Sequence, residues 1–278
     1  MFALKSAQRL SRAVRIEWVD GLRADFTYVW LRDNSQRRPS LVHLELNTQP
    51  EAIDAVDNHL HVVWPPFLAS DYSSEFLREH TKIKNSKDRK CTSATKVLAI
   101  PWRIQRKQSD ILSGQRLHMA TVEWRDTAVD PGSVWPHLER IPSVVEVESV
   151  TSLGRVHLVD AVSALTLMNR SHPELFRFLA DIPIPYAQGF FQTSHKIANI
   201  EDGRVIGAVF NNTIRSSEIT TESVEMYYQS MKIFNEICCN LLQTIELQPD
   251  ETLIVDNAQV LLGAPAQKDR RLRLKLFN

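Results

Sequence analysis

The chain has 278 residues, 43% of them hydrophobic, so it is long enough for one large domain or two smaller ones with packed cores. Its 33 Lys and Arg balance 33 Asp and Glu, which gives no overall electrostatic drive toward nucleic acid or an acidic membrane. No stretch approaches the roughly 18–20 uncharged apolar residues of a spanning helix. Three cysteines, two of them adjacent, do not suggest a disulfide framework and suit a reducing compartment. Glycine is scarce, at 8 residues, and no glycine-rich phosphate-binding signature is present.

The N-terminal segment is basic and has no acidic residue before Glu17. Its apolar residues, from Phe2 to Val14, roughly follow a helical stripe. A basic amphipathic start of this kind is typical of a mitochondrial presequence, and the alternative is a short basic helix or edge strand of the folded domain. The expected location is therefore mitochondrial or cytoplasmic.

The next part of the chain is rich in β-type runs. Residues 14–31 contain two such runs around Asp20-Gly21, a strong hairpin signal. Further strands are predicted at 41–46 and 60–64, and a short helix over 72–80. Residues 81–96 are polar and basic, which predicts a linker or a solvated loop.

The second half of the chain alternates helix and strand patterns. Ser171-His-Pro-Glu174 fits a capping box that opens a helix. From Thr220 onward, apolar residues recur at spacings of three and four, which predicts an amphipathic helix with Cys238 on its buried side. Residues 203–210 and 252–256 are predicted strands.

The polar residues alone do not reveal a catalytic constellation. None of the nine histidines is followed two residues later by Asp. His59 and His61 are spaced to share one face of a strand, as a pair of metal ligands would, but no third ligand is evident nearby. The residues by themselves therefore indicate only a β-rich protein with some helix.

Four segments carry a family resemblance. The most specific are WLRDN at 30–34 and QTSHKIANIEDGRVIGAVFNNTIR at 192–215, and they are supported by VVWPP at 62–66 and QPDETLIVDNAQVLLG at 248–263. These segments resemble the γ-butyrobetaine dioxygenase and trimethyllysine dioxygenase family, and the γ-butyrobetaine branch more closely. The resemblance extends over nearly the whole chain.

The resemblance implies an α+β fold, with a small N-terminal β-rich domain followed by an incomplete double-stranded β-helix (jelly roll) with flanking helices. The implied division is 1–82 for the N-terminal domain, 83–117 for a linker and 118–278 for an incomplete TauD-like dioxygenase domain. The family binds Fe(II) through a His-x-Asp pair and a distal His, and uses 2-oxoglutarate to hydroxylate γ-butyrobetaine to L-carnitine. An aromatic cage holds the quaternary ammonium group of the substrate, and a homodimer is a further expectation.

The iron ligands of the family are not found in this sequence. Leu262 stands where the distal His is expected, and leucine has no lone pair to donate. The family's His-x-Asp pair belongs between Asp126 and Leu158, where the chain is shorter than the family. His137 and Glu139 in that stretch form a remote substitute pair.

Residues expected on the ligand side persist in part. Arg270 aligns with the arginine that pairs with the tail carboxylate of 2-oxoglutarate, and Arg271 is an alternative for that position. A basic strand end is an equally good interpretation of both. Asn211 and Asn212 align with a pair of which one contacts the substrate carboxylate, although Asn-Asn is also a common turn device.

The cysteines of the family's N-terminal zinc site should follow WLRDN, but Ser35 to Arg38 stand there instead, so zinc is not expected. The chain is accordingly expected to lack hydroxylase activity by itself, as a shortened isoform, an incomplete gene product or a degenerate paralogue. The alternative function is a non-catalytic binding or interaction protein. Nucleic-acid contact through the basic stretches 82–90 and 268–275 is disfavoured, because no aromatic residues are interleaved with them.

Overall fold

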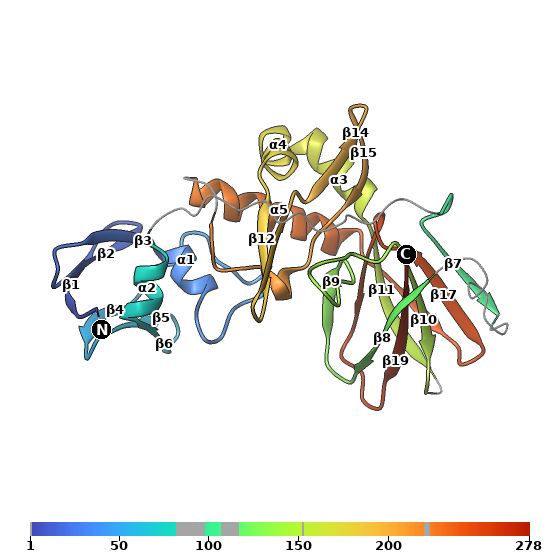
Figure 1. The fold of residues 1–278 in the computed structure, drawn as a ribbon, viewed down its shortest axis with the longest axis horizontal. Helices are drawn as coiled ribbons and strands as arrows, with labels where there is room; N and C mark the ends of the chain where they lie inside the picture. The colour runs from blue at the N-terminus through green and yellow to red at the C-terminus, as the bar shows by residue number, and fades with distance from the viewer. Residues whose placement is uncertain (1, 82–97, 107–116, 152, 220–222) are drawn as a thin grey trace. The chain divides into compact units, whose positions relative to one another are not determined.

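A computed structural model describes residues 2–81, 98–106, 117–151, 153–219 and 223–278. The chain forms two compact units (Figure 1). Unit 1 comprises residues 1–85 and 217–232, and unit 2 comprises residues 86–216 and 233–278. Within the described residues, no helix is both long and apolar enough to cross a membrane.

Unit 1 contains two three-stranded antiparallel sheets, each followed by a short helix. Their elements are β1 (Leu4–Arg9), β2 (Ala13–Trp18), β3 (Arg23–Thr27), α1 (Tyr28–Asp33), β4 (Ala52–Val56), β5 (His59–Trp64), β6 (Leu68–Ser73) and α2 (Ser74–Glu79). Strands β2 and β5 are central, and their alternate side chains, including Ile16, Trp18, Leu60 and Trp64, are fully buried. This alternation places one face of each sheet in a core, as period-2 patterning requires.

The predicted hairpin around Asp20-Gly21 is confirmed as the β2–β3 pair. Gly21 has φ +88°, a left-handed conformation that glycine adopts without strain. The basic N-terminal segment forms the edge strand β1, which pairs with β2. The prediction of a strand at 41–46 is wrong. These residues form turns and irregular backbone, and Leu41 and Leu44 are buried without joining a ladder.

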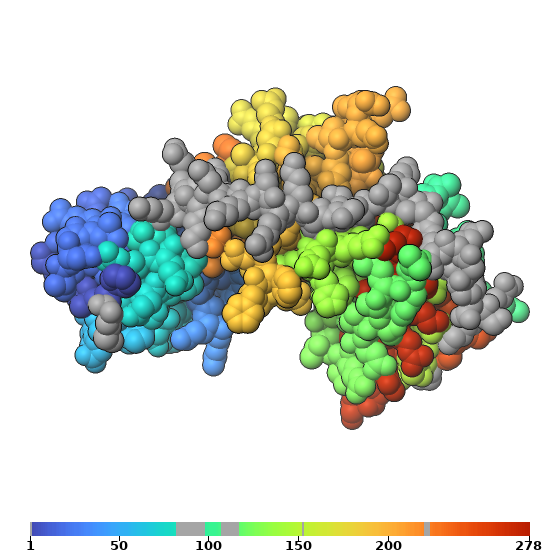
Figure 2. All heavy atoms as spheres, in the orientation of Figure 1, coloured from blue at the N-terminus to red at the C-terminus, as the bar shows by residue number. Residues whose placement is uncertain are grey.

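Unit 2 is built on two antiparallel sheets. The first has the order β7 (Trp102–Arg106), β17 (Glu251–Asp256), β10 (Val144–Ser149), β19 (Arg271–Phe277) and β8 (His118–Arg125). The second has the order β16 (Gln243–Leu247), β11 (Gly154–Asp160), β18 (Val260–Ala264) and β9 (Val129–Gly132). In the space-filling view, the green atoms of the β8 region lie beside the red atoms of the C-terminal strand, in keeping with the β8–β19 pairing (Figure 2).

Strands of unit 2 alternate between these two sheets along the chain. From β8 to β11, and again from β16 to β19, each strand lies in the opposite sheet from its neighbour in sequence. This winding is that of a double-stranded β-helix, the jelly roll. The strand β9 is reduced to four residues and matches β18 at only two positions, with a register shift between them. The predicted fold class, α+β with an incomplete double-stranded β-helix, is thereby confirmed.

One hydrophobic core fills the space between the sheets of unit 2. It contains side chains from both sheets, among them Val145, Val147, Leu158, Leu262 and Leu274. On β19 the inward leucines alternate with outward basic residues, so Leu272 and Leu274 are fully buried while Arg273 is partly exposed. Burial of apolar surface on both inner faces is what holds the two sheets together.

The connection between β11 and β16 carries most of the helices. It contains α3 (Ala161–Ser171), α4 (Pro173–Asp181), the hairpins β12 (Ile184–Gln188)–β13 (Phe191–His195) and β14 (Ala198–Glu201)–β15 (Arg204–Ala208), the 3-10 turn η1 (Asn212–Ile214) and α5 (Val224–Asn240). The predicted strands near 203–210 and 252–256 are confirmed as β15 and β17.

Of the two helix predictions for this region, one is confirmed and the other is wrong in its capping detail. The amphipathic helix is confirmed as α5, with Tyr227, Met231, Phe234 and Cys238 buried along one side. The capping box is wrong in detail, because His172 occupies the N-cap of α4 and no side chain caps the helix. Pro173 still opens that helix, since its fixed φ suits the first turn.

The predicted linker at 83–117 differs from the structure at residues 102–106, which form β7 and pair with β17. Residues 83–97 and 107–116 of that linker lie outside the described residues. Residues 217–232 belong to unit 1 although they follow most of unit 2 in sequence.

Candidate functional site

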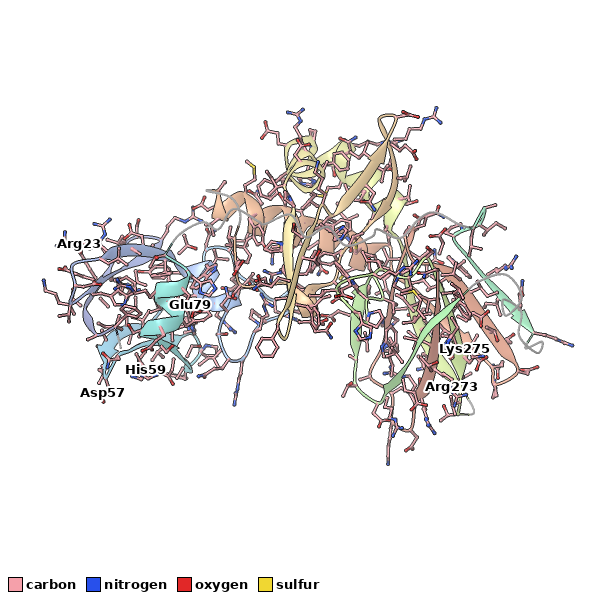
Figure 3. The ribbon with its side chains drawn as sticks, viewed as in Figure 1. Arg23, Asp57, His59, Glu79, Arg273 and Lys275 are labelled. Atoms are coloured by element: carbon pink, nitrogen blue, oxygen red, sulfur yellow. The ribbon has the colours of Figure 1, made fainter. Side chains whose placement is uncertain are left out.

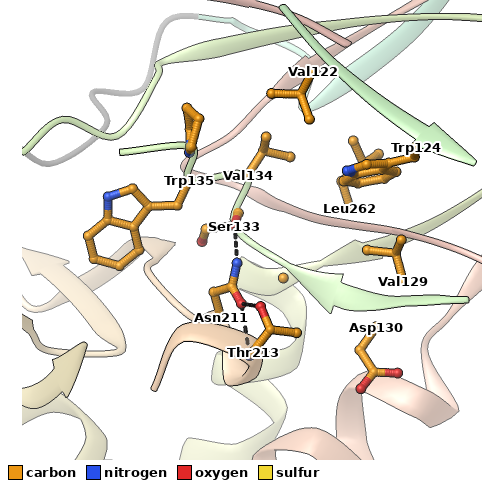
Figure 4. A pocket seen from close by; sticks show the side chains of 12 residues that line it. Val122, Trp124, Val129, Asp130, Ser133, Val134, Trp135, Asn211, Thr213 and Leu262 are labelled. Carbon is orange, nitrogen blue, oxygen red and sulfur yellow. Dashed lines mark hydrogen bonds between the residues drawn. The ribbon is translucent and has the colours of Figure 1, made fainter. Parts of the chain in front are cut away.

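A cavity of about 160 Å³ in unit 2 is lined by residues of the double-stranded β-helix and of the start of η1 (Figure 4). Its lining comes from β8, β9, β18, the segment after β9 and the start of η1: Val122, Trp124, Val129, Asp130, Gly132, Ser133, Val134, Trp135, Pro136, Asn211, Thr213 and Leu262. In Figure 4, Trp124, Val129 and Leu262 gather at one end, and Asn211 and Thr213 lie at another. The cavity therefore has an apolar wall and a polar wall.

The apolar wall is centred on Leu262, the residue that stands at the distal histidine position implied by the resemblance. Leu262 is 1% exposed, and its partner across the β18–β9 ladder is Gly132. Two residues after Gly132 comes Val134, which lines the same cavity and belongs to the same core as Leu262. A His-x-Asp pair that shared a metal ion with residue 262 would need this neighbouring position and this spacing. The chain places Gly132 and Val134 there.

Gly132 also lacks room for a side chain. A Cβ at this position would lie 3.0 Å from the carbonyl oxygen of Phe210 and 3.4 Å from Cα of Asn211. The backbone of residues 210–211 is held against it, because the Ser133 amide donates to the Phe210 carbonyl at 2.6 Å and the Phe210 amide donates to Ser133 Oγ at 3.1 Å. An imidazole at position 132 would thus require this backbone to shift.

The polar wall is ordered by Asn211. Its Oδ1 accepts hydrogen bonds from the Thr213 amide at 3.0 Å and from Thr213 Oγ1 at 2.6 Å, and its Nδ2 donates to the Ser133 carbonyl at 3.2 Å. Asn211 therefore acts as the turn device at the N-cap of η1 and also faces the cavity. Asn212 does not line the cavity, and its Oδ1 accepts from Arg215 Nε at 3.0 Å.

The segment that follows β9 is fixed from behind by Asn257, which is 1% exposed. Its Oδ1 accepts from the Val134 amide at 2.8 Å, while its Nδ2 donates to the carbonyls of Val134 and Pro142, both at 2.9 Å. This side chain replaces the strand pairing that the short β9 does not provide, because it satisfies backbone groups that would otherwise be buried without partners.

Two tryptophans of the cavity were not singled out from the sequence. Trp124 lies on β8, and Trp135 is 5% exposed and packs against Tyr186 and His195, with ring centroids 4.9 and 5.3 Å away. Burial lowers the pKa of His195 to about 4, so its imidazole is neutral at physiological pH. Tryptophan is an ordinary core residue, so a sequence does not mark these two, and only the tertiary structure brings them to one cavity.

The two arginines proposed for 2-oxoglutarate have separate environments. Arg270 is 1% exposed, with its Nη2 donating to the Thr127 carbonyl at 2.6 Å and its Nη1 donating to the Pro265 carbonyl. Burial lowers the pKa of this guanidinium. These two carbonyls engage two of the five N–H groups of the guanidinium, and within the described residues its buried Nε has no hydrogen-bond partner.

Arg271 points to the outer face of the first sheet, where its Nη2 lies 2.9 Å from Glu123 Oε1. Hydrogen bonds from Arg271 and Arg125 lower the pKa of Glu123 to about 2. The alternating pleat of β19 accounts for this placement, because Leu272 beside it is directed into the core.

The remaining metal candidates do not converge in unit 2. His137 and Glu139 are exposed residues of the turn after Pro136, and neither lines the cavity. Within the described ranges, no group of three or more His, Cys, Asp and Glu side chains is placed to hold a metal ion. The side chains of Gly132, Val134 and Leu262 offer no donor atom, so these three positions do not fit the ligand set of an Fe(II) centre.

The segment after WLRDN, where the family's zinc cysteines are expected, is held by hydrogen bonds. Ser35 Oγ donates to the Arg32 carbonyl at 2.9 Å and accepts from Arg32 Nη1 at 2.9 Å. The buried Asp33 pairs with Arg38 Nη2 at 3.0 Å and accepts from the Tyr228 hydroxyl at 2.9 Å. Donors and acceptors of the chain itself therefore order this loop.

No protein-family model matches the chain. Among solved structures it is similar to a taurine dioxygenase from Burkholderia xenovorans, at 16% identity and a TM-score of 0.40 over 50% of this chain and 53% of that one. It is also similar to PvcB from Pseudomonas aeruginosa, at 16% identity and a TM-score of 0.43 over 57% of this chain and 63% of that one. A third similar structure is an asparagine oxygenase in complex with Fe(II), at 14% identity and a TM-score of 0.42 over 54% of this chain and 49% of that one.

The chain thus covers between 49% and 63% of the length of these three structures. The fold class of unit 2 follows from its own strand order and shared core.

Proposed function

We propose that this chain is an oxygenase-fold protein of the γ-butyrobetaine dioxygenase kind that does not hold catalytic iron and does not hydroxylate by itself. The proposed lack of a catalytic iron site rests on the register of β9 against β18. It sets Leu262 opposite Gly132, with Val134 two residues further along, at the place where three metal ligands would have to meet. The sequence resemblance at WLRDN and at residues 192–215 supports the particular family.

The direct test is an assay of the purified full chain with Fe(II), 2-oxoglutarate, ascorbate and γ-butyrobetaine. We expect no succinate or carnitine above the blank without protein, and less than one tenth of an equivalent of iron after desalting. An active γ-butyrobetaine dioxygenase assayed in parallel serves as the control. Stoichiometric iron together with substrate-dependent succinate would overturn the proposed function.

A gain-of-ligand variant sharpens the test. The triple variant Gly132→His, Val134→Asp and Leu262→His installs a two-histidine, one-carboxylate donor set at this position. We expect it to acquire a Co(II) or Fe(II) site that the single variant Leu262→His lacks, at a cost in stability because of the close backbone at 210–211. Metal binding by the parent chain or by the single variant that equals that of the triple variant would show that other residues form the centre.

The retained role that best suits the cavity is the binding of a small quaternary ammonium compound. Trp124 and Trp135 provide aromatic surface, Asp130 provides negative charge and Asn211 provides an amide, all on the lining of one cavity. A trimethylammonium group is attracted to aromatic faces by cation–π interactions, worth about 0.5–2 kcal/mol each.

This role is tested by titrating the chain with γ-butyrobetaine and with its uncharged analogue, in which a carbon atom replaces the quaternary nitrogen. We expect saturable binding of the charged compound, weakened about tenfold by Trp124→Ala, and no measurable binding of the analogue. Leu167→Ala, an exposed position on α3 outside the cavity, is the control variant. Equal affinity for both compounds would contradict a cation site.

A further inference from the structure

Two histidines lie side by side on the exposed face of the sheet β4–β5–β6 in unit 1. The β4–β5 connection is a two-residue turn in which Asp57 and Asn58 have φ +48° and +63°, as the tight hairpin turn with two left-handed residues requires. Strand β5 begins directly after it, so His59 and His61 point to one face while Leu60 and Val62 are buried on the other. Their ring centroids are 6.2 Å apart.

Both rings are oriented by acceptors on the protein. His59 Nδ1 lies 3.1 Å from the carbonyl oxygen of Asp57, at the turn labelled in Figure 3. His61 Nδ1 is hydrogen-bonded to the carboxylate of Asp71 on β6. A carbonyl or a carboxylate only accepts, so each Nδ1 carries a proton, and the neutral form of each ring presents its lone pair at Nε2.

The Nε2 atoms are available as ligands. Within the part of the chain that the structure describes, neither Nε2 has a hydrogen-bond partner, and both side chains reach solvent. A histidine that donates its other ring N–H to a carbonyl or carboxylate is the usual arrangement around a protein-bound metal, because that hydrogen bond fixes the tautomer and makes the ligand more basic.

The surrounding charge favours a cation. Asp54 on β4 and Asp71 on β6 are the registered partners of His61 on either side, so two carboxylates flank this ring across the sheet. Two imidazoles on one ion, with bonds of about 2.0–2.1 Å, have ring centroids roughly 4.5–5.5 Å apart. The pair therefore needs to close by only about 1 Å, which exposed side chains achieve by small rotations.

We propose that His59 and His61 form a solvent-exposed binding site for a divalent transition-metal ion, oriented by the Asp57 carbonyl and the Asp71 carboxylate. The chain supplies two imidazole ligands, and water completes the coordination, in keeping with the absence of any group of three ligands among the described residues. Neutral imidazole suits Cu²⁺, Ni²⁺ and Zn²⁺, and Cu²⁺ binds most tightly in that series.

This histidine site is distinct from the loop after WLRDN and from the cavity around Leu262. Its ligands lie on β5, not in the loop after WLRDN, and it belongs to unit 1, whereas Leu262 and Gly132 belong to unit 2. It is therefore independent of whether unit 2 holds iron.

The test is a Cu²⁺ titration of the full chain by calorimetry in the presence of a weak competing chelator. We expect one site tighter than the rest, weakened at least tenfold by His59→Ala and by His61→Ala. The matched control His43→Ala removes an exposed histidine of unit 1 that hydrogen-bonds Ser40, and it should change the affinity less than twofold. Asp71→Asn removes only the orienting carboxylate and should weaken binding about tenfold.

Electron paramagnetic resonance of the wild-type chain with one equivalent of Cu²⁺ provides a readout that does not depend on any variant. Hyperfine splitting from two equivalent imidazole nitrogens is expected. A spectrum with one nitrogen or with oxygen ligands only would overturn the assignment. An affinity that His43→Ala lowers as much as His61→Ala does would overturn it as well, because it would show binding to scattered surface histidines.

Discussion

Replacing Asn257 with alanine tests how the wall of the cavity is held. The variant removes three buried hydrogen bonds to the backbone of Val134 and Pro142 and leaves one amide and two carbonyl groups without partners. At about 1 kcal/mol for each bond, the expected loss of stability is about 3 kcal/mol. For a unit of this size, each kcal/mol corresponds to a fall of roughly 2–4 °C in the melting temperature.

The assay is hydrogen exchange read by mass spectrometry, since it reports the segment 133–142 separately from the rest of the chain. We expect the amides of this segment to exchange about 100-fold faster in Asn257→Ala, while those of unit 1 keep their rates. Asn257→Asp is the matched variant of equal size. The aspartate keeps the acceptor for the Val134 amide, but its second oxygen replaces the NH2 group and faces the carbonyl oxygens of Val134 and Pro142. We therefore expect Asn257→Asp to be at least as destabilised as Asn257→Ala.

The result that refutes this reasoning is an Asn257→Ala chain whose stability lies within about 0.5 kcal/mol of the wild type, the level of an ordinary surface substitution. An Asn257→Asp chain as stable as the wild type would contradict the assigned donor and acceptor roles.

Three further predictions concern stability. Gly263→Ala would bring a Cβ to 2.6 Å from the Val129 carbonyl oxygen, so it should cost about 1–3 kcal/mol by displacing β9, as measured by thermal unfolding. The pKa of His195 is lowered to about 4, so its contribution to stability is full above about pH 6.5 and is lost as the pH falls toward 4. His195→Gln should therefore lose about 3 kcal/mol less than the wild type between pH 7 and 4, and equal pH profiles would contradict this. Tyr228→Phe removes a 2.9 Å hydrogen bond to the buried carboxylate of Asp33 and should cost about 1.5–3 kcal/mol in urea unfolding, whereas no change would mean that the carboxylate is satisfied without it.

Local patterns in the sequence predicted the elements that depend on neighbouring residues. The Asp20-Gly21 hairpin and the helix α5 were both recognisable, because turn chemistry and a spacing of three and four residues act over short distances. The segment 41–46 shows the limit of such patterns. Its leucines are buried, but no partner strand lies beside them, and a strand exists only through its pairing.

The candidate site likewise combines residues that the sequence indicated with residues that only the tertiary structure revealed. Leu262 was singled out through the resemblance, and so was Asn211, which proves to line the same cavity. Gly132 and Val134 were not, because their significance lies in the register of β9 against β18. That register is fixed by long-range pairing and by the close backbone of residues 210–211.

The sequence by itself determined the local β-strand and helix patterns, which follow from residue identity and short-range periodicity. Through its resemblance to the dioxygenase family it also predicted the kind of fold and pointed to Leu262 at the position of a metal-binding histidine. Only the tertiary structure decided which residues face Leu262, where the guanidinium of Arg270 is engaged, and that His59 and His61 each have a ring oriented by a hydrogen bond at Nδ1. The physical reason is that hydrogen-bond partners and strand register join residues far apart in the chain, and no local pattern encodes the distance between them.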